Sequence, residues 1–268
     1  MGKSLRNQVR YDLRVGLEWR FYLCFFLIFL FLGGSVLFAG RGAGISELNF
    51  MDYLVKIFEG IEEFQRMDRI SSFYIPKEWL IVQFPFFVYI AKYPKRDWDQ
   101  RGAQTVLRSQ SKVFWWLGKC VWLLASAVLY YIVFYLAIAM VAVSFGGSLD
   151  LQIRDVWEIG LGELRGQEGI RTLLLMPCLC SIAVGMLQMF LSFVFSPIIA
   201  LCISIAYLVL SVAVEKSWIL GNYTMLIRNR RLDVMKGVEN GTGILMSACI
   251  IGFGILMGMK YMKGKELI

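Results

Sequence analysis

The segment from Tyr93 to Lys119 holds most of the residues with chemistry to offer, and it reads YPKRDWDQRGAQTVLRSQSKVFWWLGK. Its guanidinium and carboxylate groups can form ion pairs, and its tryptophans can fill apolar pockets or mark a membrane surface. Pro94 is expected to break the helix before it, while Asp97 and Asp99 suit the start of a following helix that would run to Arg108. Such a short helix could bind a partner, but a solvated basic loop explains the segment equally well.

Several kinds of catalysis are excluded by what the sequence lacks. There is no histidine, so His-ligated metal sites, Ser-His-Asp triads and Cys-His pairs cannot form. No segment matches the phosphate-binding pattern GxxxxGK(S/T), so the chain is not expected to hydrolyse ATP or to be an enzyme. Glu62, Glu63 and Arg66 approach the EExxxR motif of CAAX-processing proteases, but the arginine is one position short and the histidines of that family are missing.

One charged residue lies inside a long apolar run, namely Lys119 between Val113 and Phe145. Ionisable groups inside a membrane are costly and are therefore functional candidates. Because Lys119 lies within about two turns of the end of this run, its ammonium is expected to snorkel to the surface. Trp115 and Trp116 would lie at the membrane surface where the helix begins. Proton-coupled transport is disfavoured, since no span buries a carboxylate away from its ends.

Composition places the chain in a membrane. Of its 268 residues, 58% are hydrophobic and only 18% are charged, with a mean hydropathy of +0.61. Soluble proteins carry about 25% charged residues. The net charge of +8 would suggest nucleic acid as a partner of a soluble protein, but the orientation of a membrane protein explains it better. All six cysteines fall in apolar runs, so a disulfide framework is not expected.

The apolar runs predict an all-α, polytopic membrane protein with six transmembrane helices in a single domain, residues 1–268. A span takes about 20 apolar residues. The expected spans are 21–40, 79–91, 113–145, two within 172–214, and 243–259. The second is the weakest, because it is short, contains Pro85 and needs residues 74–78 to cross. The 43 uncharged residues between Arg171 and Glu215 are about twice the length of one span, so they are expected to turn near Ser196 and Pro197.

The segments between these runs predict the topology. Residues 1–20 have a Leu and Val stripe beside arginines, which predicts an amphipathic helix in the membrane interface rather than a cleavable signal. Lys and Arg are about twice as dense in 1–20, 92–112 and 260–268 as in 41–77, 146–171 and 215–242. Both termini are therefore expected in the cytoplasm of a multi-pass protein of the cell membrane. The exception is the outer cluster of Arg228, Arg230, Arg231 and Lys236.

The outer segments 46–69 and 149–170 are amphipathic, and no role can be assigned to them. In the first, Met51, Leu54, Phe58, Ile61 and Gln65 repeat at three to four residues. This repeat predicts a surface or re-entrant helix.

The cytoplasmic segment resembles a motif of the ABC-2 type permeases, the membrane-spanning subunits of ABC exporters. In that motif a Tyr-Pro and an Asp precede an Arg-Ser-x-Ser-(Arg/Lys) run, two tryptophans and a lysine. The matching residues are Tyr93, Pro94, Asp97, Arg108, Ser109, Ser111, Lys112, Trp115, Trp116 and Lys119. The order of elements is also similar, including Gly221-Asn222-Tyr223, Met225 and Arg228 before the last helix. The similarity covers nearly the whole chain as architecture and about 30 residues as motif.

This resemblance implies a permease that works with other subunits. A second permease subunit, the same or a related chain, would pack beside this one, and an ABC ATPase subunit would bind beneath and carry ATP and Mg, so no cofactor is expected on this chain. Membrane lipid is a further expected partner, and nucleic acid is not. The loop 92–112 would couple to the ATPase through Tyr93, Pro94, Arg96, Asp97, Trp98, Arg101, Arg108 and Ser109. Among these, Arg96, Arg101 and Arg108 would pair with acidic groups of the ATPase, and Trp98 would fill an apolar pocket.

The expected function is export of a peptide, a drug or an amphipathic molecule, driven by the partner ATPase. The transported cargo and the identity of the second permease subunit stay open. Two alternatives also stay open: a membrane scaffold or sensor without transport activity, and a secondary transporter.

Overall fold

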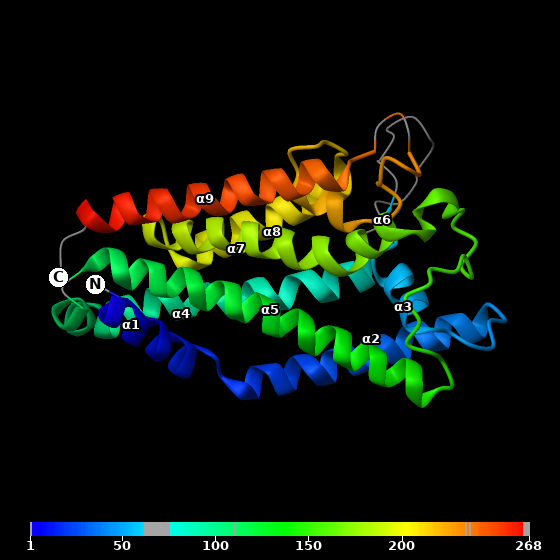
Figure 1. Cartoon of the computed structure of the whole chain (residues 1–268), viewed down its shortest axis with the longest axis horizontal. Coiled ribbons are helices and arrows are strands. Elements are labelled where there is room, and N and C mark those ends of the chain that lie inside the picture. The colour runs from blue at the N-terminus through cyan, green and yellow to red at the C-terminus, as the bar shows by residue number, and fades with distance from the viewer. Residues whose placement is uncertain (1, 62–75, 110, 234, 236, 265–268) are drawn as a thin grey trace.

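The chain forms an elongated bundle of helices (Figure 1). A computed structural model describes residues 2–61, 76–109, 111–233, 235 and 237–264. Across these residues the regular structure is helical, and the only bridge between extended residues is an isolated one that pairs Asn229 with Val238. The all-α prediction is therefore confirmed.

Long helices run along the axis of the bundle and short ones cover its ends. The long helices are α2 (Trp19–Gly42), α4 (Lys77–Ser109), α5 (Lys112–Ser144), α7 (Met176–Val194), α8 (Pro197–Ala213) and α9 (Asn240–Gly264). The shorter elements are α1 (Gly2–Gly16), α3 (Phe50–Ile57), η1 (Gly162–Arg165), α6 (Gln167–Ile170), η2 (Arg171–Leu175) and η3 (Leu220–Thr224). The elements α6, η2 and α7 follow one another without a break from Gln167 to Val194.

Four helical segments are long and apolar enough to cross a membrane. They are α2, α5, the continuous segment Gln167–Val194, and α9. The apolar helix α8 is shorter, at 17 residues. The division of the run 172–214 into two helices is confirmed, because Ser196 caps α8 by accepting a hydrogen bond from the Ile199 amide at 3.3 Å, and Pro197 takes the first helical position. The chain is thus a helical membrane protein.

Helix α4 differs from the expectation. It passes through Pro85 and Pro94 without a break, so the predicted interruption at Pro94 is wrong and most of 92–112 is helix rather than loop. Proline removes one backbone hydrogen bond and crowds the preceding turn, at a cost of about 3 kcal/mol. The turn around Pro94 is held by tertiary contacts of Tyr93 and Asp97. At about 1.5 Å per residue, the 33 residues of α4 exceed the ~30 Å hydrocarbon core by several turns.

The two ends of the bundle differ in what they contain. One end of the bundle is formed by the start of α1, the last turns of α4, the start of α5 and the end of α9 (left in Figure 1). We call it the terminal end. The opposite end carries α3, α6 and the connections around them, and we call it the distal end. The side chains of α1 that face away from the bundle include Arg6, Arg10 and Arg14, so the terminal end is basic.

The two outer amphipathic segments pack on each other at the distal end. The helix predicted from the repeat of Met51 to Gln65 is present only in part, as α3, which ends at Ile57. It is buried rather than at the surface, with Met51, Tyr53 and Leu54 fully covered. Asp52 in α3 forms an ion pair with Arg154, and its carbonyl accepts a hydrogen bond from Trp157 Nε1 at 2.9 Å. These contacts join the two segments into one layer that covers the distal end of the bundle. Gln65, and also Glu62, Glu63 and Arg66, lie outside the described residues.

One of the four residues that form the exception in the charge pattern, Arg228, has a structural role. The Arg228 side chain is 1% exposed, and its guanidinium donates to the Ser211 and Val212 carbonyls at the end of α8 and to the Asn222 side chain. The last carbonyls of a helix lack partners within the helix and carry its negative dipole end. Arg228 therefore stabilises the end of α8, and its charge is no guide to which side of the membrane this loop lies on.

Candidate functional site

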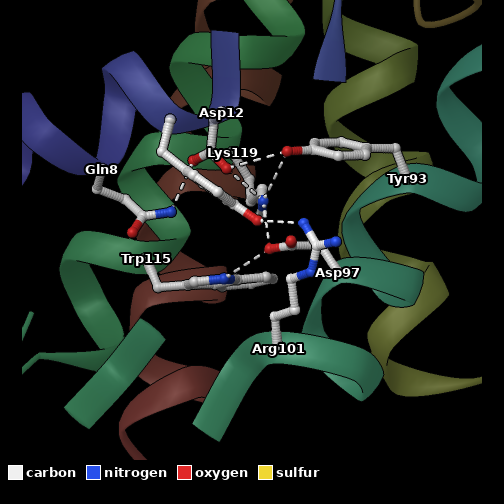
Figure 2. Close-up of polar contacts among 8 residues, drawn as sticks. Gln8, Asp12, Tyr93, Asp97, Arg101, Trp115 and Lys119 are labelled. Carbon is white, nitrogen blue, oxygen red and sulfur yellow. Dashed lines mark hydrogen bonds and ion pairs between the residues drawn. The ribbon is translucent and has the colours of Figure 1, made fainter. Parts of the chain in front are cut away.

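Three helices bring two carboxylates and one ammonium together near the terminal end of the bundle. Lys119 of α5 donates hydrogen bonds to Asp12 of α1 at 2.5 Å and to Asp97 of α4 at 2.6 Å. Figure 2 shows the ammonium between these two carboxylates. The Asp12 and Lys119 side chains are fully buried, and that of Asp97 is 3% exposed. We call these residues, together with Gln8, Tyr93 and Trp115, the ion cluster.

The neutral members of the cluster add further hydrogen bonds. The Tyr93 hydroxyl donates to Asp12 at 3.2 Å and accepts from Lys119 at 3.3 Å. Gln8 donates to the second oxygen of Asp12 at 3.0 Å, and Trp115 Nε1 donates to Asp97 at 3.2 Å. The ammonium also lies 4.4 Å from the Tyr93 ring centroid and 5.0 Å from that of Trp115, within cation–π range. Buried charges are stable only with partners of this kind.

Each of the three helices contributes two residues spaced four apart. Such residues lie on the same helical face, one turn from each other. The pairs are Gln8 and Asp12 in α1, Tyr93 and Asp97 in α4, and Trp115 and Lys119 in α5. Gly118 lets α1 come close, because a Cβ there would lie 2.5 Å from the Asp12 carboxylate oxygen. A one-residue change of phase in any of these helices would turn its pair away from the cluster.

Burial dominates the electrostatics of Asp12. Removal from water raises the pKa of this carboxyl above its ordinary value of 3.8, and the nearby Lys119 ammonium offsets part of the effect. With both carboxylates ionised, the cluster has one more negative than positive charge. Asp12 therefore takes up a proton more readily than an ordinary aspartate.

This pKa predicts a pH dependence of stability. Between pH 3.8 and the raised pKa, the folded chain binds more protons than the unfolded chain, so the contribution of Asp12 to stability is greatest below that window and is lost as pH rises through it. The unfolding temperature of wild type in detergent, relative to that of Asp12→Asn, should therefore fall as pH rises above about 4. If the unfolding temperatures of the two proteins change with pH in the same way, the pKa of Asp12 is not raised in the folded chain.

Several residues expected at the membrane surface are in the interior. Lys119 does not snorkel, and Trp115 and Trp116 are also fully buried rather than placed at an interface. Helix α1 covers the start of α5, so these side chains meet protein there and not the headgroup layer. The Asp97 side chain likewise pairs with Lys119 in the interior of the bundle. Asp97 lies within α4 and does not begin a new helix.

The residues expected to contact an ATPase divide between two faces of α4. Tyr93, Pro94 and Asp97 are buried, and Trp98 packs on Trp115 at 4.9 Å between ring centroids. The exposed face carries Arg96, Asp99, Gln100, Arg101 and Gln104. Arg96 lies 3.6 Å from Glu18, and Arg101 donates to the Tyr11 hydroxyl at 2.7 Å. Arg108 and Ser109 are the last two residues of the helix.

The α1 members of the cluster were missed from sequence. Gln8 and Asp12 did not stand out, because the Leu and Val stripe of this helix suggested its buried face. In the structure that stripe is half-buried, and Gln8, Asp12 and Gly16 face the bundle. A signal was present, since Asp12 is the only acidic residue among the first 17. A lone carboxylate in a basic helix needs a cation elsewhere, and Lys119 is the one cation inside an apolar run.

The cluster is suited to holding helices together rather than to catalysis. Its charged atoms are bonded to one another, and the described residues contain no group of three or more His, Cys, Asp and Glu side chains placed for a metal ion. Breaking a buried ion pair by removing one partner typically costs 3–5 kcal/mol. The cluster therefore joins α1 and α4 to α5 near the terminal end.

The bundle and the ion cluster define a helical membrane protein in which α1 and α4 are fixed to the apolar helix α5. The chain belongs to the family described as "Protein of unknown function (DUF2705)", whose model matches residues 21–263. Neither a curated protein nor a solved structure gave a match.

Proposed function

We propose that this chain is the membrane-spanning permease subunit of an ATP-driven ABC exporter. The observation that supports this best is the ion cluster, which fixes the last turns of α4 to the membrane-crossing helix α5. A push on those turns by a partner would move α5 and α1 with them, because all three share buried charges. Exporters of this kind need such a rigid connection between the ATPase and the spans.

The proposed topology has six spans with both termini in the cytoplasm. Helices α4 and α8 complete the set, since each runs along the bundle beside the four clear candidates (Figure 1). The basic terminal end would face the cytoplasm, in line with the positive-inside rule. Helix α1 would lie at the membrane surface, with Leu5, Val9 and Leu13 half-buried and its arginines in water.

The proposed contact with the ATPase is the exposed face at the end of α4. Arg96 and Arg101 are exposed cationic residues there, and Arg108 is proposed as a third. Charged groups of this kind steer and align partners. Tyr93, Asp97 and Trp98 would act indirectly, by holding the helix in place. A second permease subunit, ATP and Mg on the ATPase, and a peptide, drug or amphipathic cargo complete the proposal.

Charge reversal of this face should weaken the complex. Replacing Arg101 and Arg108 with Glu is expected to reduce co-purification of the ATPase subunit by tenfold or more, because close charge pairs at interfaces are each worth about 1.5 kcal/mol or more. The measurement is the ratio of ATPase to permease after affinity purification of the permease from membranes.

The matched control is Arg41→Glu, an exposed arginine at the end of α2 away from the terminal end. This variant should retain the ATPase. If the double variant and the control bind equally well, the last turns of α4 are not the contact.

A further inference from the structure

An apolar groove lies between the start of α2 and the middle of α4. It has a volume of about 390 Å³, within the range of about 300–1,000 Å³ typical of ligand pockets. Its apolar lining includes Phe21, Phe25, Phe84, Pro85 and Val88. Of these, Phe21, Phe84 and Val88 have exposed side chains, so the groove opens on the outer surface of the bundle.

One mouth of the groove is charged. Glu18, Lys92 and Arg96 line it, and Glu18 lies 3.6 Å from Arg96. Among the described residues no carboxylate lies within ion-pair distance of Lys92. The mouth therefore has an excess of positive charge, with one ammonium available to an anion.

The depth of this mouth matches the membrane surface. Trp19 is 69% exposed beside it, and Arg20 lies over the Trp19 ring at 6.0 Å. Exposed tryptophan and arginine at the start of an apolar helix mark the headgroup layer. From there the groove runs along the apolar part of α2 toward the hydrocarbon. It therefore changes from cationic at the mouth to apolar within, in the same order as the headgroup and acyl chains of a lipid.

We propose that this groove is a binding site for one anionic phospholipid. The phosphate would lie against Lys92 and Arg96, and an acyl chain would lie along Phe21, Phe84 and Val88. A zwitterionic lipid would fill the apolar part equally well, but it would add a cation at a mouth that already has an excess of positive charge. The site shares Arg96 with the proposed ATPase contact but does not use Arg101 or Arg108, so the charge reversal of those two residues leaves the groove unchanged.

Native mass spectrometry of the full chain in mild detergent tests the site. Titration with phosphatidylglycerol should give one tightly retained lipid, and phosphatidylcholine with the same acyl chains should bind at least tenfold more weakly. Lys92→Gln should weaken phosphatidylglycerol binding roughly fivefold, and Lys92→Gln with Arg96→Gln about 25-fold, since each basic residue near a headgroup contributes about one such factor. Val88→Trp, which fills the groove, should weaken both lipids.

The control is Lys260→Gln, an exposed lysine near the end of α9 that does not line the groove. It should bind phosphatidylglycerol as wild type does. Equal binding of the two lipids, or equal effects of Lys260→Gln and the double variant, would overturn the proposal and indicate only nonspecific lipid. Displacement of phosphatidylglycerol by an equal concentration of glycerol 3-phosphate would also overturn it, because the acyl groove would then contribute nothing.

Discussion

Lys119→Met is expected to destabilise the chain by about 3–5 kcal/mol, because it leaves the Asp12 and Asp97 carboxylates buried without their cation. Methionine nearly matches the lysine stem in length, so the loss reflects charge more than packing. Helix α1 should suffer most, since Asp12 is its charged contact with α5. The measurement is thermal unfolding of the purified protein in detergent, with limited proteolysis at the arginines of α1 as a local probe.

The matched comparison is a triple variant with Asp12→Asn, Asp97→Asn and Lys119→Met. It removes all three charges and should be more stable than Lys119→Met alone, because isolated buried charges are more costly than neutral groups of similar shape. An unfolding temperature of Lys119→Met within error of wild type would mean that the three groups are not paired in the folded chain.

Gly258→Ala is expected to destabilise the bundle by about 1–3 kcal/mol through overpacking. A Cβ at Gly258 of α9 would lie 2.0 Å from Cε2 of the fully buried Trp116 indole of α5. The indole cannot move aside freely, since its ring also packs against Phe193 at 5.8 Å between centroids. Helix α9 would have to shift away from α5, which the unfolding temperature in detergent should report.

Gly252→Ala is the matched control in the same helix. No atom lies within 4 Å of a Cβ placed at Gly252, and alanine favours helix more than glycine by about 1 kcal/mol. This variant should be as stable as wild type or slightly more stable. Equal losses for Gly252→Ala and Gly258→Ala would show that α9 and α5 do not meet at Trp116.

The parts of the fold that the sequence predicted depend on local signals. The division of the run 172–214 followed from its length and from Ser196 and Pro197, which cap and begin α8 whatever surrounds them. The long apolar helices followed from composition, because a lipid solvent leaves few alternatives for an uncharged run. Pro94 misled the prediction, since its local cost is outweighed by contacts of Tyr93 and Asp97 with residues far away in sequence.

The candidate site could be predicted only in part. Asp97 and Lys119 were noticed from sequence, but Lys119 was expected to reach water because its distance from the end of the apolar run allows it. What decides otherwise is α1, whose approach depends on Gly118 and on Asp12, 107 residues before Lys119. A pairing over that separation leaves no periodic signal, so the ion cluster needs the three-dimensional structure.

Cysteine labelling at Gln104 tests the central claim that the terminal end faces the cytoplasm. Gln104 is exposed in the last turns of α4, and Gln152, exposed in the connection after α5, serves as the opposite reference. In a background without the six native cysteines, Gln104→Cys should stay unlabelled by a membrane-impermeant maleimide in intact cells and become labelled after permeabilisation. Gln152→Cys should be labelled in intact cells. Labelling of Gln104→Cys in intact cells would contradict both the topology and the ATPase contact.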